Sequence, residues 1–492
     1  MEGTRKSLLK QIINWVTNEP AQEDALQTSV YWLYGVPGIG KTSLAHSICA
    51  SLHDREQLGG AFFCRRDDMN LSEPRNILPT LINKLAGILP IFRRIVAKRL
   101  RNDPNLTPES LKDTHFLDFI RSVPRQPKRT LVLVIDALDE CGNYRSRPVM
   151  LKALTDAVRE APWLKVIITS RPEADIQRFF DAPMQSSSFR YDLATDGEAI
   201  VNLKTFAQSQ FDLVAQKWYL STPWPEESVM NRVISRANGL FIFIKTLFLA
   251  LEQCEDPEEY LKGALEDPAP ISLKPLYGLY SSILKAQRVP ANAQFQRTIG
   301  VILTTGTYRP LCAKIIAEIA GVRPNLVEKW VDDLSSLLYR DEGANEGIRV
   351  RHLSISEFFA SDDCHSDYQV NLNAANTQVG IACLKTMVDE LRFNIFKLED
   401  SRCANTELKE LPALIKENIS DRLQYSCLYW SSHLCFTPDN GDSRIWGSLK
   451  EFFEGLYPLF WIEVLSIMGT VPIGAPSLRR VIFWAIVSAA PA

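Results

Sequence analysis

Uninterrupted apolar runs alternate with helical periods through the first part of the chain. LVLVI (131–135) and LKVIIT (164–169) are continuous rather than alternating in hydrophobicity. Strands that are buried on both faces require such β-branched runs, so we expect a parallel sheet with helices on each side. Three further short strands are expected at 29–35, 60–65 and 187–193. Strands that alternate with helices predict a doubly wound α/β domain.

The pattern changes after about residue 195. Helical periods continue to about residue 288 with hardly any strand, and they predict a small helical domain. Further along, helices precede the short segments LLYR (337–340) and IRVRH (348–352), which flank a Gly/Asn-rich turn. Two short strands around such a turn predict a hairpin, and helices followed by a hairpin suggest a winged helix.

The predicted fold is therefore α/β, with a doubly wound parallel-sheet domain, a helical domain, a winged helix and a C-terminal helical region. A chain of 492 residues is long enough for several domains of about 100–200 residues each. The predicted parts are an N-terminal lead-in at 1–28, the α/β domain at 29–195, the small helical domain at 196–288, the winged helix at 289–365 and the helical region at 366–492.

Composition excludes several classes of protein. The 55 basic and 58 acidic residues leave a net charge of −3, so no global basic field points to nucleic acid. Local pairs such as Arg93-Arg94 and Lys98-Arg99 fit a solvated helix face. Ten cysteines without a Cys-x-x-Cys pair argue against a zinc ribbon and fit a reducing compartment. The N-terminus lacks a signal peptide, and the apolar C-terminal segments are shorter than a membrane span. We therefore expect a cytoplasmic protein with no membrane partner.

The segment GVPGIGKT fits the phosphate-binding pattern G-x-x-x-x-G-K-[ST] between a predicted strand and a predicted helix. Its glycines let backbone N–H groups surround phosphates, Lys41 supplies a charge to them, and the Thr42 hydroxyl coordinates Mg²⁺. We expect this loop to hold ATP or ADP with Mg²⁺, which makes the α/β domain a P-loop NTPase. The predicted nucleotide contacts are Gly35, Val36, Pro37, Gly38, Ile39, Gly40, Lys41, Thr42 and Ser43.

A second motif, LVLVIDALDE (131–140), ends a buried strand in carboxylates. Asp136 stands where it can reach Mg²⁺ beside Thr42. Asp139 and Glu140 follow in the next turn, and either could orient or deprotonate an attacking water. Spacing does not decide between them. In isolation such a strand could simply end in a solvated acidic turn, but the phosphate loop upstream favours the functional interpretation.

A third candidate lies in VIITSRPE (166–173), where another parallel strand would end at the same edge of the sheet. Arg171 could sense the γ-phosphate there. The alternative is a capping serine, Ser170, followed by a surface arginine.

Several segments together resemble the NACHT class of STAND signal-transduction NTPases, and most of all the fungal NACHT proteins with a nephrocystin-like nucleotide-binding module. They are GVPGIGKTSLA, VIDALDEC, IITSRPE and RANGLFIFIKT. RVRHLSISEFF (349–359) resembles the H-x-S-x-x-x-F segment of their winged helix, and LRFNIFKLEDS…LQYSCLYWSSHL (391–434) resembles the helical segment that follows. The resemblance runs from Gly3-Thr4-Arg5 to about residue 470.

The resemblance implies a nucleotide held between the α/β core, the small helical domain and the winged helix. His352 matches the winged-helix histidine that contacts the β-phosphate of ADP in relatives, although a lone histidine at a strand end could be purely structural. Two features depart from the class. Relatives often carry Gly-x-Pro against adenine, where this chain has Gly239-Leu240-Phe241. Relatives also usually carry an N-terminal effector domain and C-terminal repeats, and we expect this chain to be truncated and to lack both.

The leading functional hypothesis is a nucleotide-dependent switch that is closed with ADP and open and able to oligomerise with ATP, with slow hydrolysis resetting it. The resemblance implies fungal non-self recognition or programmed cell death signalling, with self-oligomers or full-length NACHT relatives as partners. One alternative is a truncated nucleotide-binding adaptor or decoy without significant turnover. Another is a remodelling AAA+ ATPase, for which residues 65–125 offer no pore loop. DNA binding by the winged helix is disfavoured by Glu328, Asp332 and Asp333.

Overall fold

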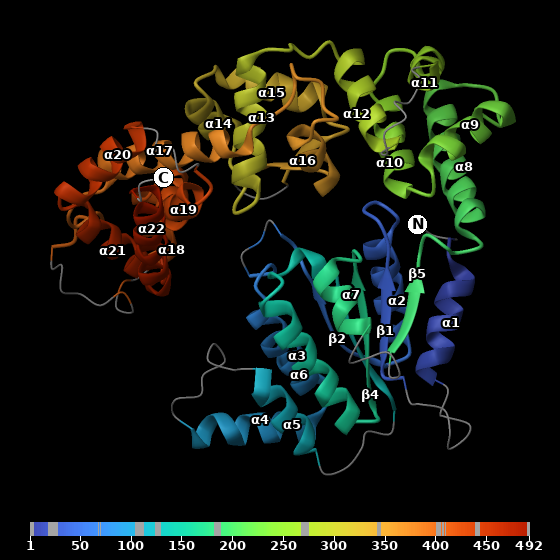
Figure 1. Ribbon diagram of the computed structural model, residues 1–492, viewed down its shortest axis with the longest axis horizontal. Helices are drawn as coiled ribbons and strands as arrows, with labels where there is room; N and C mark the ends of the chain where they lie inside the picture. The colour runs from blue at the N-terminus through green and yellow to red at the C-terminus, as the bar shows by residue number, and fades with distance from the viewer. Residues whose placement is uncertain are drawn as a thin grey trace. The chain divides into compact units, whose positions relative to one another are not determined.

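The chain divides into two compact units, Met1–Leu279 and Tyr280–Ala492 (Figure 1). The computed structural model describes residues 4–17, 28–66, 68, 70–103, 113–123, 129–181, 188–266, 275–341, 346–399, 405, 408, 410–437 and 443–489. The predicted lead-in thus lies partly outside the described residues.

The first unit is built on a five-stranded sheet with the strand order β2-β3-β4-β1-β5. Every pair of neighbouring strands is parallel, as the sequence predicted. The two continuous apolar runs form the adjacent strands β3 and β4, and β1 follows beside β4. The strands are β1 (Val30–Tyr34), β2 (Leu58–Phe63), β3 (Leu131–Asp136), β4 (Leu164–Ser170) and β5 (Ser188–Asp192).

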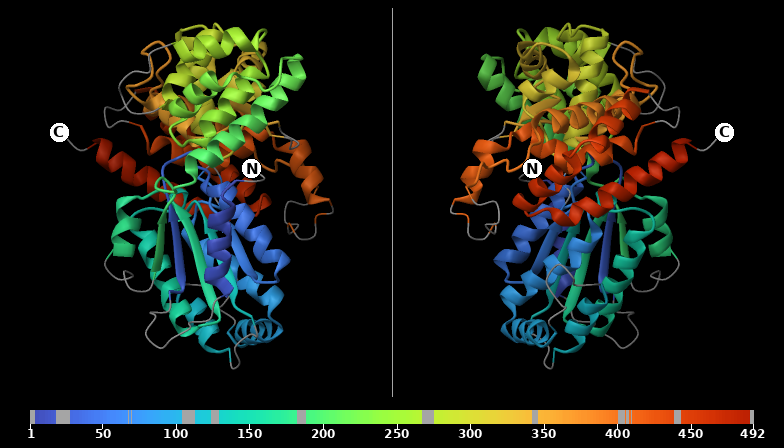
Figure 2. Two further views of the ribbon diagram at one scale, coloured as in Figure 1. Left: turned by 90° about the vertical axis from the view of Figure 1, so that its right-hand side faces the viewer. Right: turned by 90° about the vertical axis from the view of Figure 1, so that its left-hand side faces the viewer.

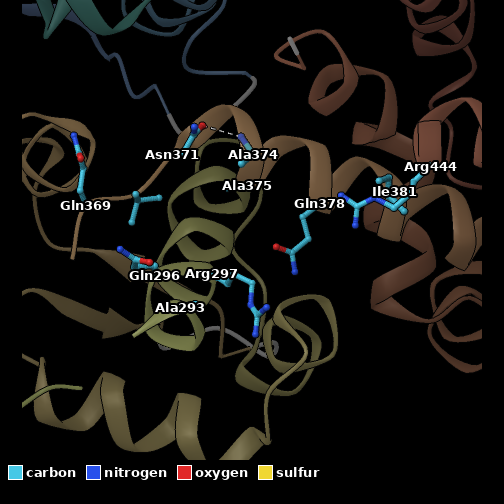
Figure 3. A pocket seen from close by; sticks show the side chains of 11 residues that line it. Ala293, Gln296, Arg297, Gln369, Asn371, Ala374, Ala375, Gln378, Ile381 and Arg444 are labelled. Atoms are coloured by element: carbon cyan, nitrogen blue, oxygen red, sulfur yellow. Dashed lines mark hydrogen bonds between the residues drawn. The ribbon is translucent and has the colours of Figure 1, made fainter. Parts of the chain in front are cut away.

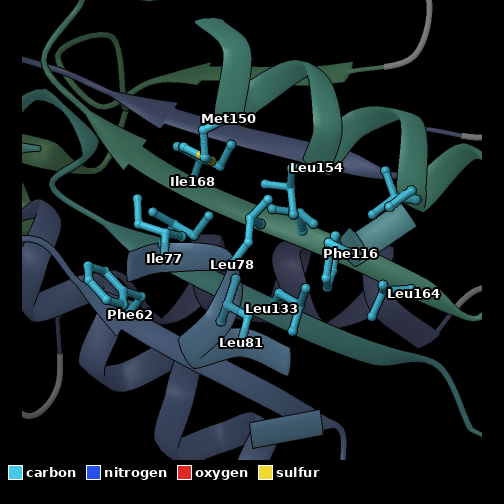
Figure 4. Packing of buried hydrophobic residues seen from close by; sticks show 14 of the residues in the cluster. Phe62, Ile77, Leu78, Leu81, Phe116, Leu133, Met150, Leu154, Leu164 and Ile168 are labelled. Atoms are coloured by element: carbon cyan, nitrogen blue, oxygen red, sulfur yellow. The ribbon is translucent and has the colours of Figure 1, made fainter. Parts of the chain in front are cut away.

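Helices cover both faces of this sheet, which confirms the doubly wound prediction (Figure 2). Successive strand residues point to opposite faces. Val132 and Val134 therefore pack with α1 (Lys6–Thr17) and α2 (Lys41–Asp54). Leu133 and its neighbours pack on the other face (Figure 4). The helices of that face are α3 (Ile77–Ile88), α4 (Pro90–Asn102), α5 (Asp113–Arg121), α6 (Ser146–Glu160) and α7 (Ala174–Asp181).

A helical segment follows the sheet within the first unit. Its backbone connects to the phosphate loop, because the Ile242 N–H donates a hydrogen bond to the Gly38 carbonyl at 3.1 Å. Most of the predicted small helical domain therefore belongs to the same compact unit as the sheet. The predicted boundary between the two at residue 195 stays a proposal. The helices are α8 (Ala199–Trp218), α9 (Glu227–Ala237), α10 (Phe241–Leu251), α11 (Pro257–Glu266) and the first part of α12 (Pro275–Ala286).

The second unit begins with helices followed by the predicted hairpin. The strands β6 (Leu338–Arg340) and β7 (Ile348–Val350) pair antiparallel. This order of elements is compatible with a winged helix, which remains a proposal. The helices before and after the hairpin are α13 (Ala293–Gly306), α14 (Ala313–Ala320), α15 (Pro324–Asp333) and α16 (Leu353–Ala360).

The rest of the second unit is helical, with α17 and α19 packed against each other. A buried His433 joins the two helices, because its ring nitrogens contact Asn376 Oδ1 at 2.8 Å and the Tyr425 hydroxyl at 2.7 Å. Burial lowers the pKa of His433 to about 3, so this histidine is neutral and structural. The helices are α17 (Leu372–Glu390), α18 (Leu411–Asn418), α19 (Asp421–Leu434), α20 (Ser443–Glu454), α21 (Tyr457–Ile467) and α22 (Gly474–Ala489).

Among the described residues, the structure contains no helix whose length and apolar content would let it cross a membrane.

Candidate functional site

The phosphate loop, Gly35–Thr42, connects β1 to the first turn of α2. Gly38 and Gly40 have φ angles of 79° and 94°, which residues other than glycine rarely adopt. The Gly35 N–H donates to the Ser170 carbonyl at 3.3 Å and holds the start of the loop against β4. Because α2 begins directly after Gly40, its N-terminal N–H groups and its positive dipole end face the loop, as anion binding requires.

Two distant elements hold the carbonyl groups of this loop. Arg5 donates from Nη2 to the Ile39 carbonyl at 2.8 Å, and Ile242 donates to Gly38 as described above. Arg5 is 3% exposed and lies over the Phe241 ring, with 5.5 Å from its guanidinium carbon to the ring centroid. Its backbone N–H donates to Asn202 Oδ1 at 2.9 Å. The loop carbonyls are thereby turned toward α1 and α10.

Lys41 reaches back over the mouth of the loop. Its Nζ donates to the carbonyls of Gly35 and Val36 at 2.8 and 3.1 Å. Burial lowers the pKa of Lys41 to about 8, against the opposing effect of nearby carboxylates, of which Asp139 is the strongest. A partly desolvated ammonium beside N–H donors is a strong attractor for phosphate oxygens.

Asp136, at the end of β3, is 1% exposed and hydrogen-bonded to two hydroxyls. Thr169 donates to its Oδ1 at 2.5 Å, and Thr42 also donates to the carboxylate. Burial raises the pKa of Asp136, whereas Thr169, Thr42 and Lys41 act to lower it. Thr169 accepts a bond from the Ala137 N–H at 2.9 Å and so fixes the turn. A hydroxyl in contact with a carboxylate is an oxygen donor set that fits Mg²⁺.

The structure gives Asp139 and Glu140 different surroundings. Asp139 is 3% exposed and accepts from Arg171 twice, from the backbone N–H at 2.9 Å and from Nε at 3.2 Å. Glu140 is partly exposed, and its Oε2 accepts from the Arg66 N–H at 3.3 Å. Burial, with the charge of Asp139 second, raises the pKa of Glu140. Asp139 therefore anchors the loop after β4, and Glu140 is the better candidate for a general base.

Arg171 lies where the sequence placed it, directly after β4, but its guanidinium is directed at Asp139. The loop that carries it is also fastened to α6. Arg147 Nη1 lies 2.6 Å from Glu173 Oε2 and 3.4 Å from Asp175 Oδ2. Arg147 is buried, Asp175 is nearly buried and Glu173 is about one-third exposed, and together they hold the loop between the acidic turn and α6.

Replacing Arg147 with methionine should release this loop. The change would leave the Asp175 carboxylate, 11% exposed, without its cation, and we expect a loss of about 3 kcal/mol in local stability around α7. Hydrogen exchange of amides in α7 would measure the loss. Arg159→Met is the matched control on the same helix, because its pair with Asp156 is half-exposed and should contribute less than about 1 kcal/mol. Equal effects of the two variants would contradict a role of Arg147 in holding this loop.

His352 belongs to the second unit, where it caps the N-terminus of α16. Its Nδ1 accepts from the Ser354 N–H at 3.2 Å and lies 2.6 Å from the Ser354 hydroxyl. That hydroxyl lies 2.7 Å from the Tyr280 hydroxyl. With Nδ1 as an acceptor, the neutral ring carries its proton on Nε2. His352 thus has a local structural task whatever else it contacts.

A separate pocket of about 490 Å³ lies in the second unit beside α13 and α17 (Figure 3). Its amide side chains already serve the fold. Asn371 Oδ1 caps α17 by accepting from the Ala374 N–H at 2.9 Å, and Gln378 Nε2 donates to the Ile319 carbonyl at 2.5 Å. Arg297 and Arg444, which also line it, are exposed. The pocket brings no acid–base pair together.

Sequence reasoning missed Arg5, Arg66 and Arg147 as parts of this site. Each contacts a site segment that is between 26 and 74 residues away in the chain. Arg5 fell within the segment that resembles NACHT proteins, but no pattern indicated its contact with the phosphate loop. Thr169 lies at the end of a predicted strand, but no pattern in the sequence indicated its bond to Asp136.

A comparison with family models found a match that lies within the first unit. Residues 9–171 match the model described as "Nephrocystin 3, N-terminal". This nephrocystin-like region is about a third of the chain, and it contains the phosphate loop, Asp136, Glu140 and Arg171. It has the P-loop NTPase fold that the sequence predicted. His352 and Arg5 lie outside it. No curated protein matches the chain.

Several solved structures resemble the chain at low identity. Cdc6p from Pyrobaculum aerophilum is 13% identical, with 73% of this chain and 93% of that chain covered and a TM-score of 0.33. The STAND protein PH0952 from Pyrococcus horikoshii, which has a tetratricopeptide repeat sensor, is 13% identical, with 95% and 65% covered and a TM-score of 0.36. A chain of the Drosophila ORC bound to DNA is 16% identical, with 68% and 87% covered and a TM-score of 0.33. Such TM-scores do not establish a common arrangement of the whole chains.

Proposed function

We propose that this protein is a nucleotide-dependent molecular switch of the NACHT/STAND class that binds ATP or ADP with Mg²⁺. The observation that carries the proposal is the convergence of Lys41, Thr42 and Asp136 at the carboxyl edge of the parallel sheet, with Glu140 in the next turn. The nephrocystin-like match over the same residues supports it. On the sequence resemblance, we place the switch in fungal non-self recognition or cell death signalling.

The proposed chemistry follows from the surroundings of each side chain. The loop N–H groups and Lys41 would bind the phosphates, while Thr42 and Asp136 would hold Mg²⁺, which neutralises phosphate charge when bound. Glu140, with its raised pKa, would accept a proton from an attacking water. Arg171 would sense the γ-phosphate if it exchanged its contact with Asp139 for a phosphate oxygen. That exchange would make turnover slow, because it breaks a buried pair.

A switch requires that nucleotide bind two states unequally. Arg5 and α10 offer a means, since both hold carbonyls of the phosphate loop. A change in the loop on exchange of ADP for ATP would pull on both contacts and on α8 through Asn202. We propose that this connection transmits the state of the site to the helices that follow the sheet.

Comparison of the wild-type chain loaded with ADP and with a non-hydrolysable ATP analogue tests the switch. We expect a compact form with ADP and larger species with the analogue at the same salt concentration, measured by size-exclusion chromatography with light scattering. The alternative is an adaptor that binds nucleotide without significant turnover, partnering full-length relatives. Identical particles in both states, with no measurable phosphate release, would favour that adaptor over the switch.

For the switch we further propose that His352 donates a hydrogen bond to the ADP β-phosphate in the closed state. A charge-assisted bond of this kind contributes roughly 1.5–3 kcal/mol, and each ~1.4 kcal/mol is a factor of ten. His352→Leu should therefore speed ADP release by about one to two powers of ten, with ATP affinity changed less. Stopped-flow release of fluorescent ADP measures the rate.

The capping role of His352 requires its own control. His352→Asn keeps an acceptor for the Ser354 N–H, because asparagine is a good N-cap residue, but it shortens the side chain. If His352 binds ADP, both variants should release ADP faster. Fast release in the leucine variant alone would mean that only the α16 cap matters, and the phosphate contact would be wrong.

A further inference from the structure

The outer face of α4 is strongly basic in an otherwise slightly acidic protein. Between Pro74 and Asn102 the chain has no Asp or Glu but contains Arg75, Lys84, Arg93, Arg94, Lys98, Arg99 and Arg101. Without these seven cations the net charge of the chain would fall from −3 to −10. The charge of the protein is thus distributed very unevenly.

On α4, three of these cations form one stripe. Arg94, Lys98 and Arg101 have the spacing i, i+4, i+7, which places them along a single helix face. Phe92 and Val96, which are buried with 0% and 8% exposure, fix the opposite face against the core. The three cations are exposed, and none of them belongs to an ion pair within the described parts of the chain. Like charges at this spacing repel one another and destabilise the helix, so a partner that carries carboxylates would reduce this repulsion.

A complementary surface lies elsewhere on the same unit. Residues 252–259 contain five carboxylates and no Lys or Arg. Of these, Glu255, Glu258 and Glu259 are exposed at the start of α11. Asp256 Oδ1 accepts from the N–H groups of Glu258 and Glu259 at 2.9 and 3.0 Å and makes this acidic turn rigid.

The two surfaces lie at opposite ends of the first unit (Figure 1). The helix α4 is at the end of the sheet away from the phosphate loop, whereas α11 lies on the other side of the loop beside α8, α9 and α10. One copy of the unit therefore cannot bring them together. Two copies can, and each copy presents both surfaces.

We propose that the basic face of α4 docks against the acidic turn Glu255–Glu259 of a second copy of this chain. The contact is head to tail, so it leaves one free surface of each kind and can continue into a ring or a filament. It is independent of the proposed nucleotide chemistry. The rest of the chain is acidic and would repel a nucleic acid from this helix face. The same acidic residues can supply carboxylates to the basic face of another copy.

Charge reversal in matched sets provides the test. Arg94→Glu/Lys98→Glu/Arg101→Glu makes both surfaces acidic, and Glu255→Lys/Glu258→Lys/Glu259→Lys makes both basic. Sedimentation velocity should show wild-type self-association at about 50 mM salt that is lost by about 500 mM, because exposed charges are screened. Each triple variant alone should self-associate at least about tenfold more weakly. An equimolar mixture of the two should recover association, because each variant then meets its opposite charge.

The control reverses three exposed cations of the second unit, Lys314→Glu/Arg323→Glu/Lys329→Glu, with the same change in net charge. It should associate like the wild type, and thermal melting followed by circular dichroism should show that all variants are folded. A strictly monomeric wild type at low salt would overturn the proposal. So would failure of the mixture to associate, or a loss in the control as large as in the α4 variant. Capture of a DNA duplex or of anionic vesicles by α4 in place of self-association would also overturn it.

Discussion

Replacing Lys41 with alanine should lower the affinity for ATP and ADP by at least about 100-fold, because a charge-assisted phosphate contact of about 3 kcal/mol is lost. The loop itself should survive, since its conformation depends on Gly38 and Gly40 and on the bonds from Arg5 and Ile242. Titration calorimetry with Mg²⁺ present measures both affinities. Lys10→Ala, which removes an exposed lysine from α1 of the same unit, is the matched control and should change nothing.

The pH dependence distinguishes the charge of Lys41 from its shape. Its pKa of about 8 in the free protein means that the ammonium is protonated at pH 7 and increasingly neutral above pH 8. Bound phosphate favours the charged form, so wild-type binding should take up a proton and weaken as pH rises above 8. The alanine variant should lack this slope. Unchanged affinity in a folded Lys41→Ala variant would remove the nucleotide-site assignment.

The second large effect is expected at Glu140. Glu140→Gln should slow hydrolysis at least about 100-fold, the usual contribution of a general base, and should leave ATP affinity within about threefold. A base must be deprotonated, and burial beside Asp139 raises the pKa of Glu140. The wild-type rate should therefore fall as pH drops through that raised pKa, and the fall should disappear in the glutamine variant. Phosphate release under single-turnover conditions measures the chemical step.

Asp139→Asn is the informative comparison. Asparagine still offers an oxygen to the Arg171 N–H but no charge to its guanidinium, so we expect a looser β4–α7 loop and a smaller change in rate. Its main effect should be faster hydrogen exchange around Arg171. If Asp139→Asn abolished turnover and Glu140→Gln did not, the assignment of the base to Glu140 would be wrong.

The sequence alone was sufficient to predict the parallel sheet of the first unit and the helices that cover it. Continuous apolar runs became the buried parallel strands β3 and β4, because a strand covered on both faces has no place for alternating polar residues. The phosphate loop was recognisable because a backbone that surrounds phosphate needs glycine at positive φ, and that requirement is local. The hairpin of the second unit followed from its turn residues in the same way.

Only the tertiary structure distinguishes the surroundings of the two carboxylates, on which the proposal of Glu140 as the base rests. Asp139 and Glu140 are neighbours with the same chemistry, and their difference arises from Arg171 and Arg66, which approach from other segments. The ties from Arg5 to Ile39 and to Asn202, and from Arg147 to Glu173, likewise join residues distant in the chain. Such contacts depend on how helices pack on the sheet. Hydrophobic periodicity records which face of an element is buried, but not which polar side chain of another element will meet it there.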